Sequence, residues 1–135
     1  GEGELFDEMQ CLAKRLSVSD KVEFLGLQSN VYPYLHEADV FCLPSEYEGV
    51  PMTLIEAMGT GLPIIAGNVG GIPDMLANGE SAFLIEPKIN EVEIALEALY
   101  SSEELRATLG QAARKRSEDF SSASMAKGYM NIYRC

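Results

Sequence analysis

Two carboxylates separated by seven residues, Glu48 and Glu56, form the densest chemical feature of this sequence. Glu48 lies in a polar loop, and Glu56 lies within the helix that we predict over residues 51–60. At about 100° per residue, Glu56 falls on the side of that helix opposite Leu54, which we expect to face the core. A carboxylate accepts the two hydrogen bonds that a sugar or ribose diol offers. The pair therefore suits a cleft that binds a polyhydroxylated ligand.

The segment between the two acids leads into a helix N-terminus. Pro51 suits the first helical position, because its missing N–H is not needed there. The free N–H groups and the positive dipole end of such a helix bind anions, and Gly49 lets a ligand approach the backbone closely. A diphosphate therefore fits beside the acids. The spacing alone is also typical of two solvated surface acids, and only the surrounding residues favour a binding site.

Short apolar strands alternate with helices along the first two thirds of the chain, which indicates a parallel sheet covered on both faces. The predicted strands are residues 22–25, 40–43, 63–66 and 82–85. The predicted helices are residues 4–16, 30–37, 51–60 and 72–77, followed by three apolar helical stripes that begin at Val92, Leu105 and Met125. The predicted fold class is α/β, a Rossmann-like doubly wound parallel sheet. Such sheets bind ligands at the carboxyl ends of their strands, where the loop with Glu48 lies.

The composition fits one globular domain over residues 1–135, with 47% hydrophobic residues and no linker. A net charge of −11 argues against a nucleic-acid partner, because phosphate backbones select basic surfaces. The spacing of the Cys and His residues indicates no metal site, and it favours reduced thiols in the cytoplasm. We expect Cys42 in the core, because residues 40–43 are typical of a strand buried on both faces. Residues 1–4 read as a loop entering a helix, so we expect a first strand to be missing upstream.

Several segments together resemble the core signature of the family 4 retaining glycosyltransferases, and the resemblance covers nearly the whole chain. They are Val22–Gly26, Ala38–Phe41, Leu43–Ser45, Glu48–Pro51, Leu54–Met58, Gly61–Pro63, Gly70–Asp74, Phe120-Ser121 and Tyr129…Tyr133. Gly1-Glu2-Gly3 is similar to the family's Gly-x-Gly loop, and Asp74 stands where the family usually has Glu. The resemblance implies a GT-B fold, in which two Rossmann-like domains face each other across a cleft. Residues 1–135 would be its C-terminal, nucleotide-sugar-binding domain, without the N-terminal acceptor domain.

The same resemblance assigns roles to the residues of the candidate site. Glu48 would be the catalytic residue, a carboxylate that contacts donor-sugar hydroxyls and stabilises charge rather than acting as a nucleophile. Glu56 would bind the ribose. The other donor-binding residues would be Gly49, Val50, Met52 and Thr53 at the phosphates, Gly3 at the phosphates or the sugar, and Leu27, Gln28 and Asn30 around the base.

By this resemblance, the full enzyme transfers a hexose from a UDP- or GDP-sugar to a saccharide or lipid-linked acceptor, for polysaccharide or glycolipid synthesis. It needs no metal or cofactor, and it acts in the cytoplasm with possible peripheral contact to a membrane. The family's Arg and Lys for the diphosphate would lie upstream, and this chain has no Lys or Arg between Lys21 and Lys88. The helix dipole contributes only about 0.3–1 kcal/mol. We therefore expect weak donor binding and no turnover by this chain alone.

Two other functions remain open. One is a GT-B sugar-nucleotide epimerase. A GT-B phosphorylase would need a lysine for its pyridoxal cofactor, and this chain has none that is suitably placed. The other is a non-catalytic, acidic α/β interaction domain. Two further features have plain structural interpretations: His36 as a surface residue, and the Met and Tyr stripe of the last helix as packing.

Overall fold

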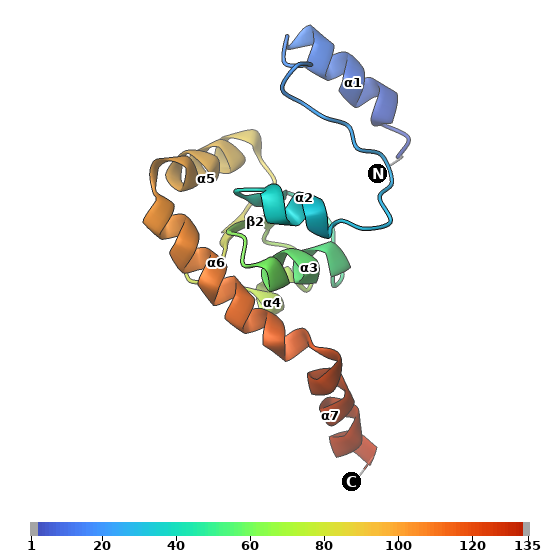
Figure 1. The fold of residues 1–135 in the computed structure, drawn as a ribbon, viewed down its shortest axis with the longest axis vertical. Helices are drawn as coiled ribbons and strands as arrows, with labels where there is room; N and C mark the ends of the chain where they lie inside the picture. Colours follow the sequence, from blue (N-terminus) through green and yellow to red (C-terminus); the bar gives the residue numbers. More distant parts are fainter. Residues whose placement is uncertain (1–2, 134–135) are drawn as a thin grey trace. The chain divides into compact units, whose positions relative to one another are not determined.

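The computed structural model describes residues 3–133, which divide into two compact units between Pro33 and Tyr34 (Figure 1). The first unit contains α1 (Phe6–Arg15), which corresponds to the first predicted helix. The strand predicted at residues 22–25 is wrong, because this segment belongs to no strand of the structure. A strand forms only when a neighbour pairs with its N–H and C=O groups. Phe24 instead packs edge to face against Phe6, with ring centroids 5.6 Å apart.

The second unit is built on a parallel sheet in the order β1-β2-β3. Its strands are β1 (Phe41–Leu43), β2 (Ile64–Gly67) and β3 (Phe83–Ile85), so the other three predicted strands are confirmed. Around them lie α3 (Met52–Thr60), α4 (Ile72–Met75), α5 (Ile89–Ser101), α6 (Glu103–Ser117), the 3-10 turn η1 (Glu118–Phe120) and α7 (Ser122–Tyr133). The short helix α2 (Tyr32–Glu37) spans the boundary between the two units. Each crossover between neighbouring strands contains a helix, as parallel pairing requires.

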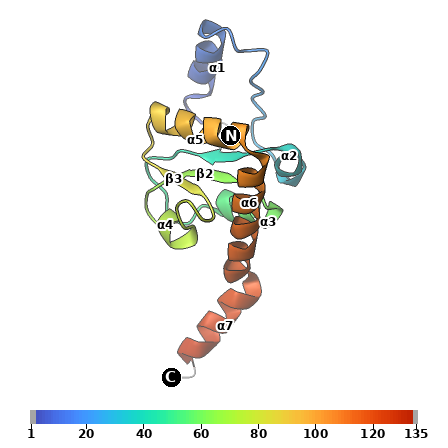
Figure 2. The same ribbon diagram turned by 90° about the vertical axis from the view of Figure 1, so that its left-hand side faces the viewer.

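Helices cover the sheet on both faces, which Figure 2 shows with α5 on one side and α3 and α4 on the other. Side chains alternate along β2, so Ile64 packs with α3 and α4 while Ile65 packs with α5. α6 contributes to both clusters, through Ala113 to the first and Leu109 to the second. This arrangement confirms the predicted Rossmann-like α/β fold.

β1 is less covered than its sequence suggests. Cys42 is exposed, so the predictions that residues 40–43 are buried on both faces and that Cys42 is a core residue are wrong. β1 pairs with β2 along one edge, and α5 packs on β2 and β3. Phe41 and Leu43 point to the other face, where they pack against the α3 cluster. An apolar run can therefore form an edge strand with a single covered face.

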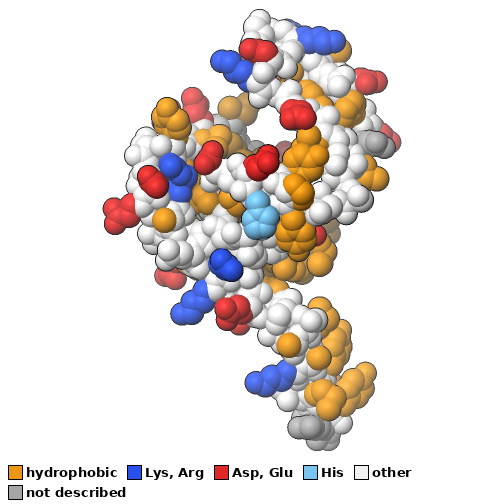
Figure 3. Space-filling view, in the orientation of Figure 1, with side chains coloured by type: hydrophobic (Ala, Val, Ile, Leu, Met, Phe, Trp, Pro, Cys, Tyr) orange, Lys and Arg blue, Asp and Glu red, His pale blue; other side chains and the backbone are white. Residues whose placement is uncertain are grey.

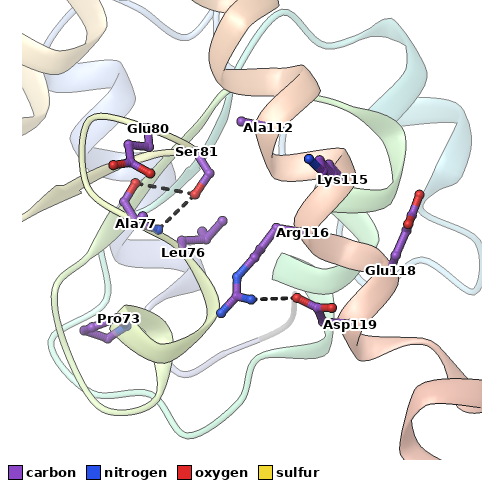
Figure 4. Close-up of a pocket in the computed structure, with 10 residues that line it drawn as sticks. All are labelled: Pro73, Leu76, Ala77, Glu80, Ser81, Ala112, Lys115, Arg116, Glu118 and Asp119. Carbon is purple, nitrogen blue, oxygen red and sulfur yellow. Dashed lines mark hydrogen bonds and ion pairs between the residues drawn. The ribbon is translucent and has the colours of Figure 1, made fainter.

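Arg116 of α6 links that helix to the end of α4, and Figure 4 shows its guanidinium pointing toward the α4 turn. Its Nε and Nη2 donate to the carbonyl oxygens of Met75 and Asp74, at 3.1 and 2.9 Å. Its Nη1 forms an ion pair of 2.6 Å with Asp119. The planar fork of donors lets one side chain hold several acceptors at once.

We expect Arg116→Ala to lower the free energy of unfolding by about 1 kcal/mol, because two carbonyls lose a charged donor at a partly exposed site. Urea unfolding followed by circular dichroism measures this change. The neighbouring Lys115→Ala is the matched control, since Lys115 is exposed and is expected to leave the midpoint within experimental error. Equal midpoints for both variants would mean that the contact with α4 contributes nothing to stability.

The last helix of the second unit exposes a set of apolar side chains. Figure 3 shows apolar side chains gathered on α7, where Met125, Tyr129 and Ile132 are 60, 58 and 71% exposed. The predicted packing role of this stripe is therefore not fulfilled within the unit. His36 is exposed, as predicted. Within residues 3–133, no helix combines the length and the apolar character needed to cross a membrane.

Candidate functional site

The carboxyl ends of the three parallel strands bring three loops to one edge of the sheet. These loops are residues 44–51 after β1, residues 68–71 after β2 and residues 86–88 after β3. We call the first of them the acidic loop, because it contains Glu46 and Glu48. This edge is where open parallel sheets bind their ligands.

Glycines at the end of β2 and in the loop after it allow the acidic loop to lie directly against the neighbouring backbone. A Cβ atom on Gly67 would lie less than 3.0 Å from the carbonyl oxygen of Ser45, and one on Gly70 would overlap the carbonyl of Glu48. Gly70 also has a φ of +54°, in the left-handed region that favours glycine. Gly71 donates its N–H to the carbonyl of Gly49 at 3.1 Å. The backbone of the acidic loop is therefore held against the neighbouring backbone at Ser45 and at Glu48, the two ends of the segment that positions the acid.

The side chain of Glu48 is fixed as well. The hydroxyl of Ser45 donates a hydrogen bond of 2.8 Å to its Oε1, and both residues are half-buried. Sequence reasoning did not identify Ser45 or Gly67 as parts of the site. The Pro44-Ser45 pair that follows β1 was a weak signal for the first, and nothing in the local sequence links Gly67 to Ser45.

Glu56 lies in the second turn of α3, as predicted, and the helix packs through the expected residues. Leu54 and Met58 are fully buried, whereas Glu56 is half-buried on another side of the helix. Pro51 takes the N-cap position rather than the first helical position, with φ −72° and ψ 120°. Pro51 makes no side-chain cap hydrogen bond, so the N-cap residue offers no side-chain acceptor that competes for the amides of Met52 and Thr53. Anion binding at this helix N-terminus stays a prediction.

Among the described residues, neither Glu48 nor Glu56 forms an ion pair. In the part of the chain that the structure describes, the ion pairs are Lys88 with Glu86 and Arg116 with Asp119. Lys88 is the first cation after Lys21 in the sequence, and its hydrogen bond and charge lower the pKa of Glu86. The same contact raises the pKa of Lys88. Lys88, which lies in the loop after β3 at the same edge of the sheet, is therefore already paired with an acid.

The other predicted donor-binding residues belong to the first unit. Leu27 is 77% exposed, and the amide of Gln28 donates to the carbonyl of Leu25 at 2.5 Å. The Oδ1 of Asn30 accepts the N–H of Tyr32 at 3.1 Å, which starts α2. Gly3 is exposed, and Gly1 lies outside the described residues. Their participation in one site with Glu48 and Glu56 stays a prediction.

Three cavities of about 530, 510 and 470 Å³ lie on the second unit, and the smallest of them is lined by Pro44 of the acidic loop and by Pro87 and Lys88 of the loop after β3. Figure 4 shows the largest, which lies between α4 and α6 and contains Arg116 and Ser81. Neither Glu48 nor Glu56 lines any of the three. Among residues 3–133, no group of three His, Cys, Asp or Glu side chains is placed to hold a metal ion.

Comparison with known proteins places this geometry in context. Residues 1–116 match the family described as glycosyl transferases group 1. The chain is 37% identical to the N-acetyl-alpha-D-glucosaminyl L-malate synthase of Bacillus anthracis, over 98% of this chain and 35% of the enzyme. It therefore spans about a third of the length of this relative.

Solved structures share the fold. Sucrose-phosphate synthase from Thermosynechococcus elongatus superposes with a TM-score of 0.86 at 29% identity, over 95% of this chain and 33% of that enzyme. HepE of Anabaena, solved in complex with UDP, superposes with a TM-score of 0.89 at 21% identity, over 95% and 36% of the two chains.

Proposed function

Since the chain belongs to the glycosyl transferases group 1 family, we propose that it is the C-terminal, nucleotide-sugar-binding half of a family 4 retaining hexosyltransferase. The observation that carries this proposal is the placement of Glu48 and Glu56 on either side of an uncapped helix N-terminus, at the carboxyl edge of the sheet. The full enzyme would make a polysaccharide or glycolipid in the cytoplasm. An N-terminal domain would bind the saccharide or lipid-linked acceptor.

The proposed reaction follows from the charges that this edge offers. The diphosphate of a UDP- or GDP-sugar lies on the amides of Gly49, Val50, Met52 and Thr53. Glu56 accepts hydrogen bonds from the ribose diol, and Glu48 accepts them from the hexose. As the bond to the diphosphate breaks, positive charge develops on the sugar ring, and the fixed carboxylate of Glu48 stabilises it. The UDP complex of the structurally similar HepE agrees with this choice of ligand.

A nucleotide titration of this chain tests the proposal. We expect UDP or GDP to shift the amide NMR signals of residues 52–56 and 27–30 at millimolar concentration. Binding is expected to be weak, because Lys88 is paired with Glu86 and helix N-termini contribute little energy to anion binding. If neither nucleotide shifts these signals at millimolar concentration, the chain is better explained as a non-catalytic, acidic interaction domain.

Glu56→Ala is expected to weaken UDP or GDP binding about tenfold, because the ribose loses hydrogen bonds to a charged acceptor. The titration above measures the affinity. Glu97→Ala is the control, because it removes a carboxylate from the middle of α5. The 2′-deoxy nucleotide provides a second check. It should bind the unchanged chain more weakly than the ribonucleotide does, and the variant should no longer distinguish the two. Unchanged affinity of the variant for the ribonucleotide would exclude the ribose role.

A further inference from the structure

We propose that Ser45 is the positioning residue for Glu48, so that the contact between their side chains sets the direction of the carboxylate before any ligand arrives. The proposal rests on the function proposed above for Glu48. Ser45 itself is not assigned a contact with the substrate.

The first support is that both backbones joined by this hydrogen bond are held in place. The carbonyl of Ser45 lies against Gly67, and the carbonyl of Glu48 lies against Gly70. Gly71 donates to the carbonyl of Gly49, which fixes the loop just after Glu48. A hydrogen bond between two mobile loop residues would say little about function. A bond between two fixed backbones selects one orientation of the side chain.

The second support is the chemistry of the bond. The Ser45 hydroxyl donates to Oε1 of Glu48 at 2.8 Å, a charge-assisted hydrogen bond that leaves Oε2 without a partner among the described residues. A free Glu side chain samples several rotamers and must be ordered during the reaction. Orienting it in advance removes that requirement, which is how fixed charges contribute most to a transition state. Ser45 therefore affects turnover through Glu48.

The main test is a double-mutant cycle on the full-length enzyme that contains this chain. We expect Ser45→Ala to lower kcat about tenfold and to leave the KM for the donor within about twofold. Ser45→Thr keeps the hydroxyl and should restore most of kcat. In the Glu48→Ala background, Ser45→Ala should cause no further loss, because the group that it positions is gone.

Ser102→Ala serves as the control for lost stability. Its hydroxyl accepts the N–H of Leu105 at 3.1 Å and caps α6, so its removal should lower Tm and leave kcat unchanged. Side-chain NMR couplings of Glu48 in this chain give a readout that does not need turnover. They should report one rotamer in the unchanged chain and averaged rotamers in Ser45→Ala.

The outcomes separate this inference from the proposed function. If Glu48→Ala lowers kcat but Ser45→Ala does not, or if the two losses multiply, Ser45 does not act through Glu48 and only the positioning role fails. Unaltered rotamer couplings in Ser45→Ala would overturn it as well. If Glu48→Ala turns over at the wild-type rate, both the positioning role and the proposed role of Glu48 are lost.

Discussion

Replacing Glu48 by Gln is expected to lower the turnover of the full-length enzyme at least about a hundredfold while changing nucleotide affinity less than about threefold. Gln keeps the size of the side chain and an oxygen that can accept from Ser45, so the local geometry should survive. The variant removes the negative charge that would stabilise the developing positive charge on the sugar. Loss of one fixed electrostatic contact in an active site typically costs about 10²–10³ in rate.

The measurement is kcat with the natural donor, together with the dissociation constant of the free nucleotide. Glu46→Gln is a matched control, because Glu46 lies in the same loop, carries the same charge and is exposed. It should change both quantities by less than about twofold. Wild-type turnover in Glu48→Gln and in Glu48→Ala would end the catalytic assignment, and equal losses at positions 46 and 48 would point to the net charge of the loop instead.

Gly110→Ala is expected to reduce the free energy of unfolding by about 1–3 kcal/mol, although alanine is the better helix former. Gly110 lies in the interior of α6 and is buried against the end of α3. A Cβ atom there would lie less than 3.0 Å from the carbonyl oxygen of Gly61. That carbonyl belongs to a left-handed C-cap with φ +80°, so the contact can be relieved only by moving the two helices apart.

Gly59→Ala provides the opposite expectation on the partner helix. Gly59 lies within α3, and a Cβ atom built there has no neighbour within 4 Å. The substitution should therefore raise the free energy of unfolding by about 0.5–1 kcal/mol, through the entropy of the unfolded chain. Urea unfolding of both variants beside the unchanged chain measures the difference. Similar shifts in the same direction would show that the close approach of α3 and α6 does not limit position 110.

Local patterns predicted most of the fold. Residues 63–66 are apolar at every position, and β2 is buried on both faces as such a run indicates. The spacing of Leu54 and Met58 placed both in the core, and Glu56 away from full burial, because helical periodicity decides which side packs. The prediction failed at residues 22–25 and at Cys42. In both cases the outcome depended on whether a neighbouring element was available, which the pattern of the segment itself does not record.

The candidate site divides in the same way. Glu48, Glu56 and the helix start between them were accessible to sequence reasoning, because they are close together in the chain. The contacts of Ser45 with Gly67, and of Gly71 with Gly49, join the loop after β1 to the end of β2 and to the loop after β2. Only the register of β1 against β2 brings them together, and no local spacing encodes it. Sequence reasoning could therefore propose the residues that bear charge, but it could not predict these backbone contacts.

The way the acidic loop is anchored also bears on enzyme engineering. Its main chain lies against Gly67 at the end of β2 and Gly70 in the loop that follows, while the side chains of Tyr47 and Val50 are 89 and 60% exposed. Randomising these two positions should thus leave the path of the loop intact and keep Glu48 and Glu56 in their present positions. A combinatorial library restricted to them would test whether these side chains influence the choice of ligand, whereas substitutions at Gly67 or Gly70 would place a Cβ atom against the backbone of the acidic loop.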